Sequence, residues 1–176
     1  MDITTKIQAF EYFLAQILEW GKTMVPVVPL SSFTRLKALK LLFFTAAVRN
    51  DEGVDLLDVF DNFHALPNGP VESDVYNYIT ADKLTFYTFR NFSLGLKQPY
   101  SDVNIPVELK NRLDVAVDSV KKKNVRMVYY TAGELVDLSH LWMSWQSSIR
   151  IANALGKGSY KMDVNKIRSN TQIFSL

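Results

Sequence analysis

The sequence predicts a mainly α-helical protein, a single compact multi-helix domain over residues 1–176 built around a buried central helix, with at most one short β element. Three observations carry this prediction. Of the 176 residues, 48% are apolar and 22% charged, a balance typical of a folded globular domain. Apolar residues recur at helical spacing in several segments, and helix-capping patterns precede some of them. One segment, residues 33–48, is apolar on nearly all sides, as expected of a buried helix.

The first expected element is an amphipathic helix over residues 5–20, because its apolar residues repeat every three or four positions. Two prolines within residues 25–30 exclude a helix there and predict an extended connector. The buried helix over residues 33–48 follows. After it, a short helix is expected at residues 55–59.

The next segment combines a turn with helix-start signals. Asn68 and Gly69 tolerate positive backbone dihedrals, and Pro70 suits the first position of a helix, where its missing N–H is not needed. Glu72 and Asp74 then fall in the first turn, where negative charge opposes the positive end of the helix dipole. Taken alone, these residues indicate a structural turn followed by a helix.

Residues 80–100 are rich in aromatic side chains whose spacing fits neither one helix nor one strand. Gly95 and Pro99 interrupt the segment. We expect a helix followed by a loop, and Thr85–Thr88 paired as a short strand is the alternative.

The last third of the chain carries the clearest helix signals. Asn104 is expected to cap a helix whose apolar stripe ends at Lys121–Lys123. Thr131 and Glu134 form a capping box, and the helix behind it either runs on or restarts towards residue 155. A short final helix is expected over residues 163–168.

The order of several of these segments resembles a known family. A Lys-Leu-Leu-Phe-Phe helix at residues 40–44, the Phe63–Tyr76 segment, a Leu-x-x-x-Ser-His helix and a terminal helix follow one another. This order is similar to that of the Panacea domain, found in SocA-like antitoxins and phage-associated GepA-like proteins. The resemblance spans residues 32–174 and departs from the family pattern at Ser144-Trp145, where a Pro-Trp pair is common. The matching positions are Phe63, Ala65, Gly69, Pro70, Val71, Tyr76, His140 and Trp145.

The resemblance implies a Panacea-like helical domain and an antitoxin that neutralises a partner toxin by direct protein–protein binding. It also implies that an adjacent gene encodes the toxin. The alternative within the family is a proteolytic adaptor that delivers the toxin to a protease. The matching positions are expected to be structural.

Composition and charge argue against several other classes of protein. The absence of cysteine excludes disulfides, thiol catalysis and thiolate metal sites. Charged residues interrupt the apolar series of residues 5–20, so we expect neither a membrane span nor a signal sequence there, and a cytoplasmic protein. The formal charge of +2 is small for a nucleic-acid module.

No catalytic, cofactor or metal site is expected. The two histidines, His64 and His140, lack the spacing of a metal-binding helix. Ser139 and His140 are neighbours on a predicted helix and therefore point in different directions, which does not suit a nucleophile and its base. An acidic run is expected to be solvated and not to hold a cation; it comprises Asp51, Glu52, Asp55, Asp58 and Asp61.

Two surfaces are candidates for partner binding. Exposed aromatic and arginine side chains are typical anchors of protein interfaces. The candidate contacts with the toxin are Phe86, Tyr87, Phe89, Arg90 and Phe92. The less favoured surface is Lys121–Lys123 with Arg126 and Tyr129, which would suit a phage-derived DNA-binding regulator.

Overall fold

The computed structural model describes residues 1–49, 53–101 and 105–176. Within these residues, seven α-helices combine with two small antiparallel sheets and two 3-10 helices, Leu30–Ser32 and Met127–Tyr129. The fold is therefore mainly α, as predicted, but the prediction of a multi-helix domain with at most one short β element is wrong. One sheet is a two-stranded hairpin, and the other is a hairpin with a third strand beside it.

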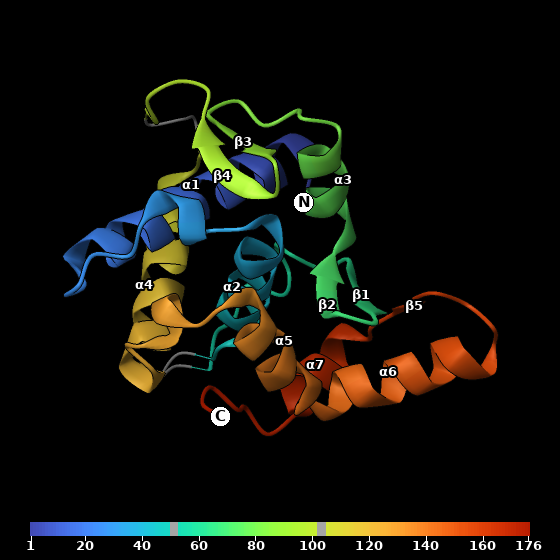
Figure 1. Ribbon diagram of the computed structural model, residues 1–176. Coiled ribbons are helices and arrows are strands. Elements are labelled where there is room, and N and C mark those ends of the chain that lie inside the picture. Colours follow the sequence, from blue (N-terminus) through green and yellow to red (C-terminus); the bar gives the residue numbers. More distant parts are fainter. Residues whose placement is uncertain (50–52, 102–104) are drawn as a thin grey trace.

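Three long helices build the main part of the core. They are α1 (Ile3–Thr23), α2 (Arg35–Ala47) and α4 (Val107–Lys123). Figure 1 shows α2 in the middle of the molecule, and this helix contacts α1, α4, α5 and β2. Every residue from Lys37 to Ala47 is buried, which confirms the buried central helix.

The segment after Asn62 differs from its prediction. β1 (Phe63–Leu66) and β2 (Gly69–Glu72) form an antiparallel hairpin, and α3 (Ser73–Thr80) begins only after it. The placement of Pro70 at the first position of a helix is therefore wrong. Pro70 instead lies in β2, an edge strand, where a residue without an N–H is tolerated. Glu72 caps α3 by accepting a hydrogen bond from the Val75 N–H.

The aromatic segment also forms a hairpin, so the prediction of a helix followed by a loop is wrong, and the alternative of a short strand at Thr85–Thr88 is met in part, at Tyr87 and Thr88. β3 (Tyr87–Arg90) pairs with β4 (Ser93–Leu96), and Arg90 lies opposite Ser93 across a two-residue turn. Asn91 and Phe92 form this turn with φ of 51° and 66°. Positive φ at both central residues is the geometry that matches the twist of a hairpin.

The C-terminal third follows its predictions closely. The Thr131 capping box starts α5 (Ala132–His140), and the chain restarts as α6 (Met143–Ala154). Between these helices the Trp142 ring is fully buried and packs 5.0 Å from Phe43. α7 (Val164–Ser169) is the predicted final helix, and β5 (Tyr160–Lys161) adds a third strand beside β1.

Residues 55–59 form a turn and not the predicted short helix. The Asp55 carboxylate accepts a hydrogen bond from the Leu57 N–H, a local bond that competes with helical pairing. The predicted cap Asn104 and the acidic residues Asp51 and Glu52 lie outside the described residues. Over the described part of the chain, no helix is long and apolar enough to cross a membrane.

Candidate functional site

A groove with a volume of about 480 Å³ lies beside the β1–β2 hairpin. Five parts of the chain border it: the start of α2, the tip of the β1–β2 hairpin, α3, the turn of the β3–β4 hairpin and the start of α5. Its lining is mostly apolar and includes Leu36, Leu39, Leu66, Val71 and Phe92. A groove of this size and character is typical of binding sites.

Arg35 is the charged residue of the groove lining. Its guanidinium carbon lies 5.4 Å from the centre of the Tyr76 ring and 5.8 Å from that of Phe92. Both distances are those of cation–π contacts. Within the described residues, no carboxylate pairs with this guanidinium. The rings thus lie beside a positive charge in the groove that no carboxylate of the described residues pairs with.

Phe92 is the most exposed aromatic side chain of the groove, with 71% of its surface accessible. Its φ of 66° lies in the left-handed region, which is a strained position for a bulky residue. Backbone hydrogen bonds fix the turn, since the Phe92 carbonyl accepts from the Arg35 N–H at 2.9 Å. An exposed ring in a position that favours glycine indicates a role other than stability.

Beneath the groove, Lys40 bonds to the tip of the β1–β2 hairpin, and α5 packs closely against it. Lys40 is fully buried on α2, and its ammonium donates to the Pro70 carbonyl at 2.5 Å. Gly69 has a φ of 88°, and a Cβ there would lie 2.3 Å from Ser139 Oγ. Glycine is therefore required both for the backbone conformation and for the close approach of α5.

The far side of the same tip rests on an aromatic pair. Trp145 Nε1 donates to the Leu66 carbonyl at 3.0 Å. The His140 ring stacks on Trp145 with 3.8 Å between the ring centres and 11° between the planes. Burial lowers the pKa of His140, which favours the neutral ring. Ser139 Oγ donates to the Val136 carbonyl on its own helix, and not to the imidazole.

The structure thus brings the residues of the family resemblance together around one hairpin. Gly69, Pro70 and Val71 form β2, and His140 and Trp145 hold the tip from α5 and α6. Phe63 and Ala65 are buried in β1, and Tyr76 lines the groove from α3. Their contacts explain why this residue pattern stabilises the wall of the groove.

Burial makes the stability contributed by Lys40 dependent on pH. Burial lowers the pKa of Lys40 to about 7, well below that of an unfolded lysine. Between pH 7 and pH 9 the unfolded chain therefore holds a proton that the folded chain releases, and stability rises with pH. Relative to Lys40→Met, the wild-type free energy of unfolding should increase by about 2 kcal/mol over this range. Urea unfolding at several pH values measures this difference, and parallel curves for the two proteins would contradict it.

A second lysine holds the other end of the hairpin. The Lys6 ammonium lies 2.7 Å from Asp61, 3.0 Å from Glu72 and 2.7 Å from Asp74. These three carboxylates lie close enough together to hold a metal ion, with one oxygen of each within 4.8 Å of the others. The Lys6 ammonium already supplies these carboxylates with the positive charge that a metal ion would bring. The cluster therefore ties α1 to the start of α3.

The predicted partner contacts divide by exposure. Phe86 and Tyr87 are buried, at 5% and 1% exposure, and their rings pack against Tyr100. Phe89 is half-buried against the core. The Arg90 side chain is 79% exposed and lies 3.8 Å from Asp82. Of the five predicted contacts, Arg90 and Phe92 are thus the ones that a partner can reach.

The lysine cluster at the end of α4 interacts largely with the protein itself. Lys121 pairs with Asp118 and lies 5.8 Å from the Trp20 ring, and Lys123 lies 5.5 Å from the Phe174 ring. Tyr129 donates its hydroxyl to the Pro26 carbonyl. These contacts give the cluster a structural role without a nucleic acid.

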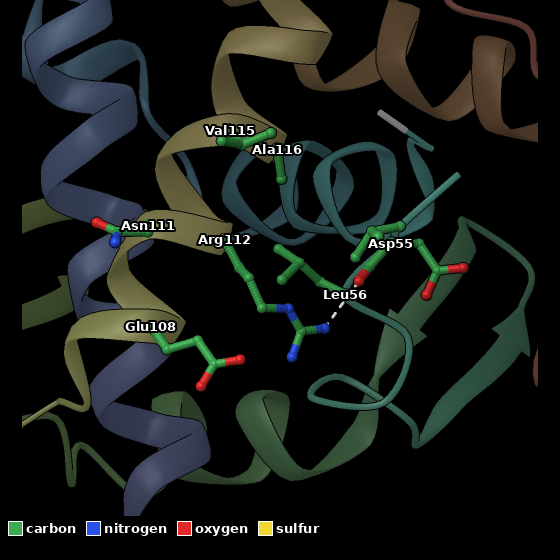
Figure 2. A pocket seen from close by; sticks show the side chains of 8 residues that line it. Asp55, Leu56, Glu108, Asn111, Arg112, Val115 and Ala116 are labelled. Carbon is green, nitrogen blue, oxygen red and sulfur yellow. Dashed lines mark hydrogen bonds between the residues drawn. The ribbon is translucent and has the colours of Figure 1, made fainter. Parts of the chain in front are cut away.

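A second hollow, of about 460 Å³, lies between α4 and residues 54–56 (Figure 2). Figure 2 shows the Arg112 side chain pointing from α4 towards the Asp55 backbone, whose carbonyl it bonds at 2.9 Å. The same guanidinium forms two hydrogen bonds with Asp58, and Asp55 pairs with Arg168 at 2.8 Å. Arg112, which lines this hollow, and Arg168 are therefore paired with aspartates, whereas Arg35 has no carboxylate partner among the described residues.

The sequence did not single out Arg35 or Lys6, and Lys40 entered only as part of the pattern at residues 40–44. For Lys6 and Lys40 no local signal exists, because their partners lie at least 30 residues away in the sequence. Arg35 does leave a signal, since a positive charge at the first position of a helix opposes the helix dipole. A residue that breaks a local rule in this way is often functional.

Comparison of the sequence with protein-family models gives no match, and comparisons with curated proteins and with solved structures give none.

Proposed function

We propose that this protein is an antitoxin-type interaction protein that neutralises a partner toxin by direct protein–protein binding through the groove beside the β1–β2 hairpin. The observation that carries the proposal is Phe92, an exposed ring held at positive φ above an apolar groove. Aromatic and arginine side chains dominate the binding energy of protein interfaces, and Phe92 and Arg35 lie in contact here. The resemblance to the Panacea domain supports the choice of a toxin as the partner.

Co-expression tests the proposal. The open reading frame adjacent to the gene is expressed alone and with this chain, growth is followed, and the pair is isolated by affinity capture. The proposal expects growth arrest by the neighbour alone, and rescue with the neighbour retained on the column. Rescue with loss of the neighbour would instead indicate a proteolytic adaptor. A harmless neighbour that is not captured would contradict the proposal.

Phe92→Gly separates binding from folding. Glycine adopts positive φ without strain, so the free energy of unfolding should stay unchanged or rise by up to about 1 kcal/mol. Capture of the partner should fall at least about tenfold, because the aromatic anchor is lost. Both quantities are measured on the purified chain, by urea unfolding and by titration with the partner.

Asn91→Gly is the matched control. Asn91 also has positive φ in the same turn, and its replacement relaxes the backbone without removing a ring. It should bind the partner as the wild type does. Equal binding by Phe92→Gly and Asn91→Gly would exclude the Phe92 ring as an anchor.

A further inference from the structure

We infer that the groove binds a segment of the partner that carries a carboxylate, and that this carboxylate pairs with Arg35. The inference rests on the proposed function, since it names the chemistry of the partner at the same site. It commits to an acidic side chain within an otherwise apolar stretch of protein.

The groove carries one formal charge. Of the residues that line it, Arg35 is charged and the others are apolar or neutral. They comprise Thr34, Leu36, Leu39, Leu66, Pro67, Asn68, Val71, Tyr76, Phe92 and Ala132. One positive charge among apolar surfaces is complementary to one negative charge among apolar side chains. A nucleic acid would require several cations along its backbone, so its phosphates fit this groove poorly.

The Arg35 guanidinium makes cation–π contacts in the groove. It is half-buried between two rings, and within the described residues it has no carboxylate partner. A guanidinium carries five N–H donors in a planar fork that matches the two oxygens of a carboxylate. The cation–π contacts with Tyr76 and Phe92 restrict the guanidinium before any partner arrives, which reduces the conformational entropy lost on pairing.

Arg35 also lies at the start of a helix. The residue is the first of α2, a helix of 13 residues, so the positive end of the helix dipole lies at the same place. Ala132, the first residue of α5, also lines the groove. The start of α2, which has no acidic residue in its first turn, adds to the attraction for a negative group, whereas Glu134 already opposes the dipole at the start of α5. The field and the side chain thus favour the same kind of ligand.

Arg35→Gln and Arg35→Lys test the inference on the full chain with the captured partner. Arg35→Gln should weaken binding about 10- to 100-fold, while Arg35→Lys, which keeps the charge and loses the fork, should lie between it and the wild type. Arg150→Gln, an exposed arginine on α6, is the control and should bind normally. The melting temperature of each variant shows whether it folds. Normal binding by a folded Arg35→Gln would overturn the inference and leave the proposed function standing.

Charge reversal identifies the partner's carboxylate. Arg35→Glu should abolish capture, and one Asp→Lys or Glu→Lys change in the partner should restore it. If every single reversal in the partner fails to restore capture by a folded Arg35→Glu, the pairing is wrong. Restoration by a change in a second copy of this chain would likewise contradict a toxin carboxylate.

A peptide experiment tests the preference of the groove for a carboxylate without the toxin. Two pools of acetylated pentapeptide amides carry Leu, Ile, Val or Phe at four positions and either Asp or Asn at the centre. They are passed over the immobilised full chain, and the retained peptides are counted by mass spectrometry. Asp peptides should be enriched at least about tenfold over Asn peptides on the wild type and not on Arg35→Gln. Equal recovery of both pools would overturn the inference, whereas enrichment without rescue of growth would overturn the proposed function alone.

Discussion

Replacement of Lys6 by methionine is expected to lower the free energy of unfolding by about 3–5 kcal/mol. The reason is that the variant keeps the negative charge of the carboxylates that Lys6 pairs with. Lys6 is 5% exposed and Glu72 is fully buried, so removal of the ammonium leaves a buried carboxylate beside Asp61 and Asp74 without a counter-charge. Urea unfolding at pH 7 measures the loss.

Lys22→Met is the matched control for this variant. Lys22 pairs with Glu19 at 3.2 Å, but both side chains are about two-thirds exposed, at 68% and 64%. Exposed pairs contribute about 0–1 kcal/mol, so this change should have little effect. Equal effects of the two substitutions would show that the Lys6 cluster does not hold the hairpin.

The effect of Lys6→Met should also shrink in acid. Burial opposes ionisation of Asp61 and Asp74, but the hydrogen bonds and charge of Lys6, together with the Asn62 hydrogen bond to Asp74, outweigh it and hold the pKa of each below its usual value. Carboxylates with a lowered pKa contribute stability that is present above about pH 4 and lost as the pH falls through the folded value. Wild type and variant should therefore converge as the pH falls below about 4.

Gly69→Ala is expected to destabilise the protein by about 2–4 kcal/mol. Part of this cost comes from the φ of 88°, and the larger part from a Cβ that would lie 2.3 Å from Ser139 Oγ and 3.0 Å from Lys40 Cε. Gly156→Ala isolates the first part, because Gly156 has a φ of 63° and open space around it. Thermal and urea unfolding of both variants measure the difference.

Ser139→Ala in the Gly69→Ala background removes the nearest atom. It should restore part of the lost stability if the close approach of α5 to the hairpin is the cause. The same cost for Gly69→Ala and Gly156→Ala, with no recovery in the double variant, would mean that the backbone conformation alone requires glycine at position 69.

The helices were predictable because their signals are local. The capping box of Thr131 and Glu134 contains both halves of its interaction within four residues, and the structure has it as expected. The apolar composition of residues 33–48 likewise predicts burial without any knowledge of distant contacts. The structure confirms it, because α2 is the buried helix at the centre.

The hairpins were not predicted, and the reason differs between the two. Phe92 adopts positive φ, a conformation that residue preferences assign to glycine or asparagine. At the other hairpin, Pro70 suits a helix start as well as an edge strand, and only its pairing with Ala65 decides between them. Local sequence rules favour the wrong choice in both segments.

Part of the candidate site was predicted and part was not. The resemblance gave the residues that build the hairpin wall, and the aromatic content of residues 80–100 drew attention to Phe92. Arg35 escaped because lysine and arginine are read as surface residues, and its ring partners lie 41 and 57 positions further along the chain. Contacts over such separations exist only in the folded chain.

Hydrogen exchange on the captured complex tests most directly whether the partner occupies this groove. Backbone amides are compared with and without the partner, over the described residues. Slower exchange should be confined to the hairpin tip around residues 66–71, the turn at residues 90–93 and the start of α2. Protection centred on Lys121–Arg126 at the end of α4, with the groove unchanged, would contradict the groove as the binding site.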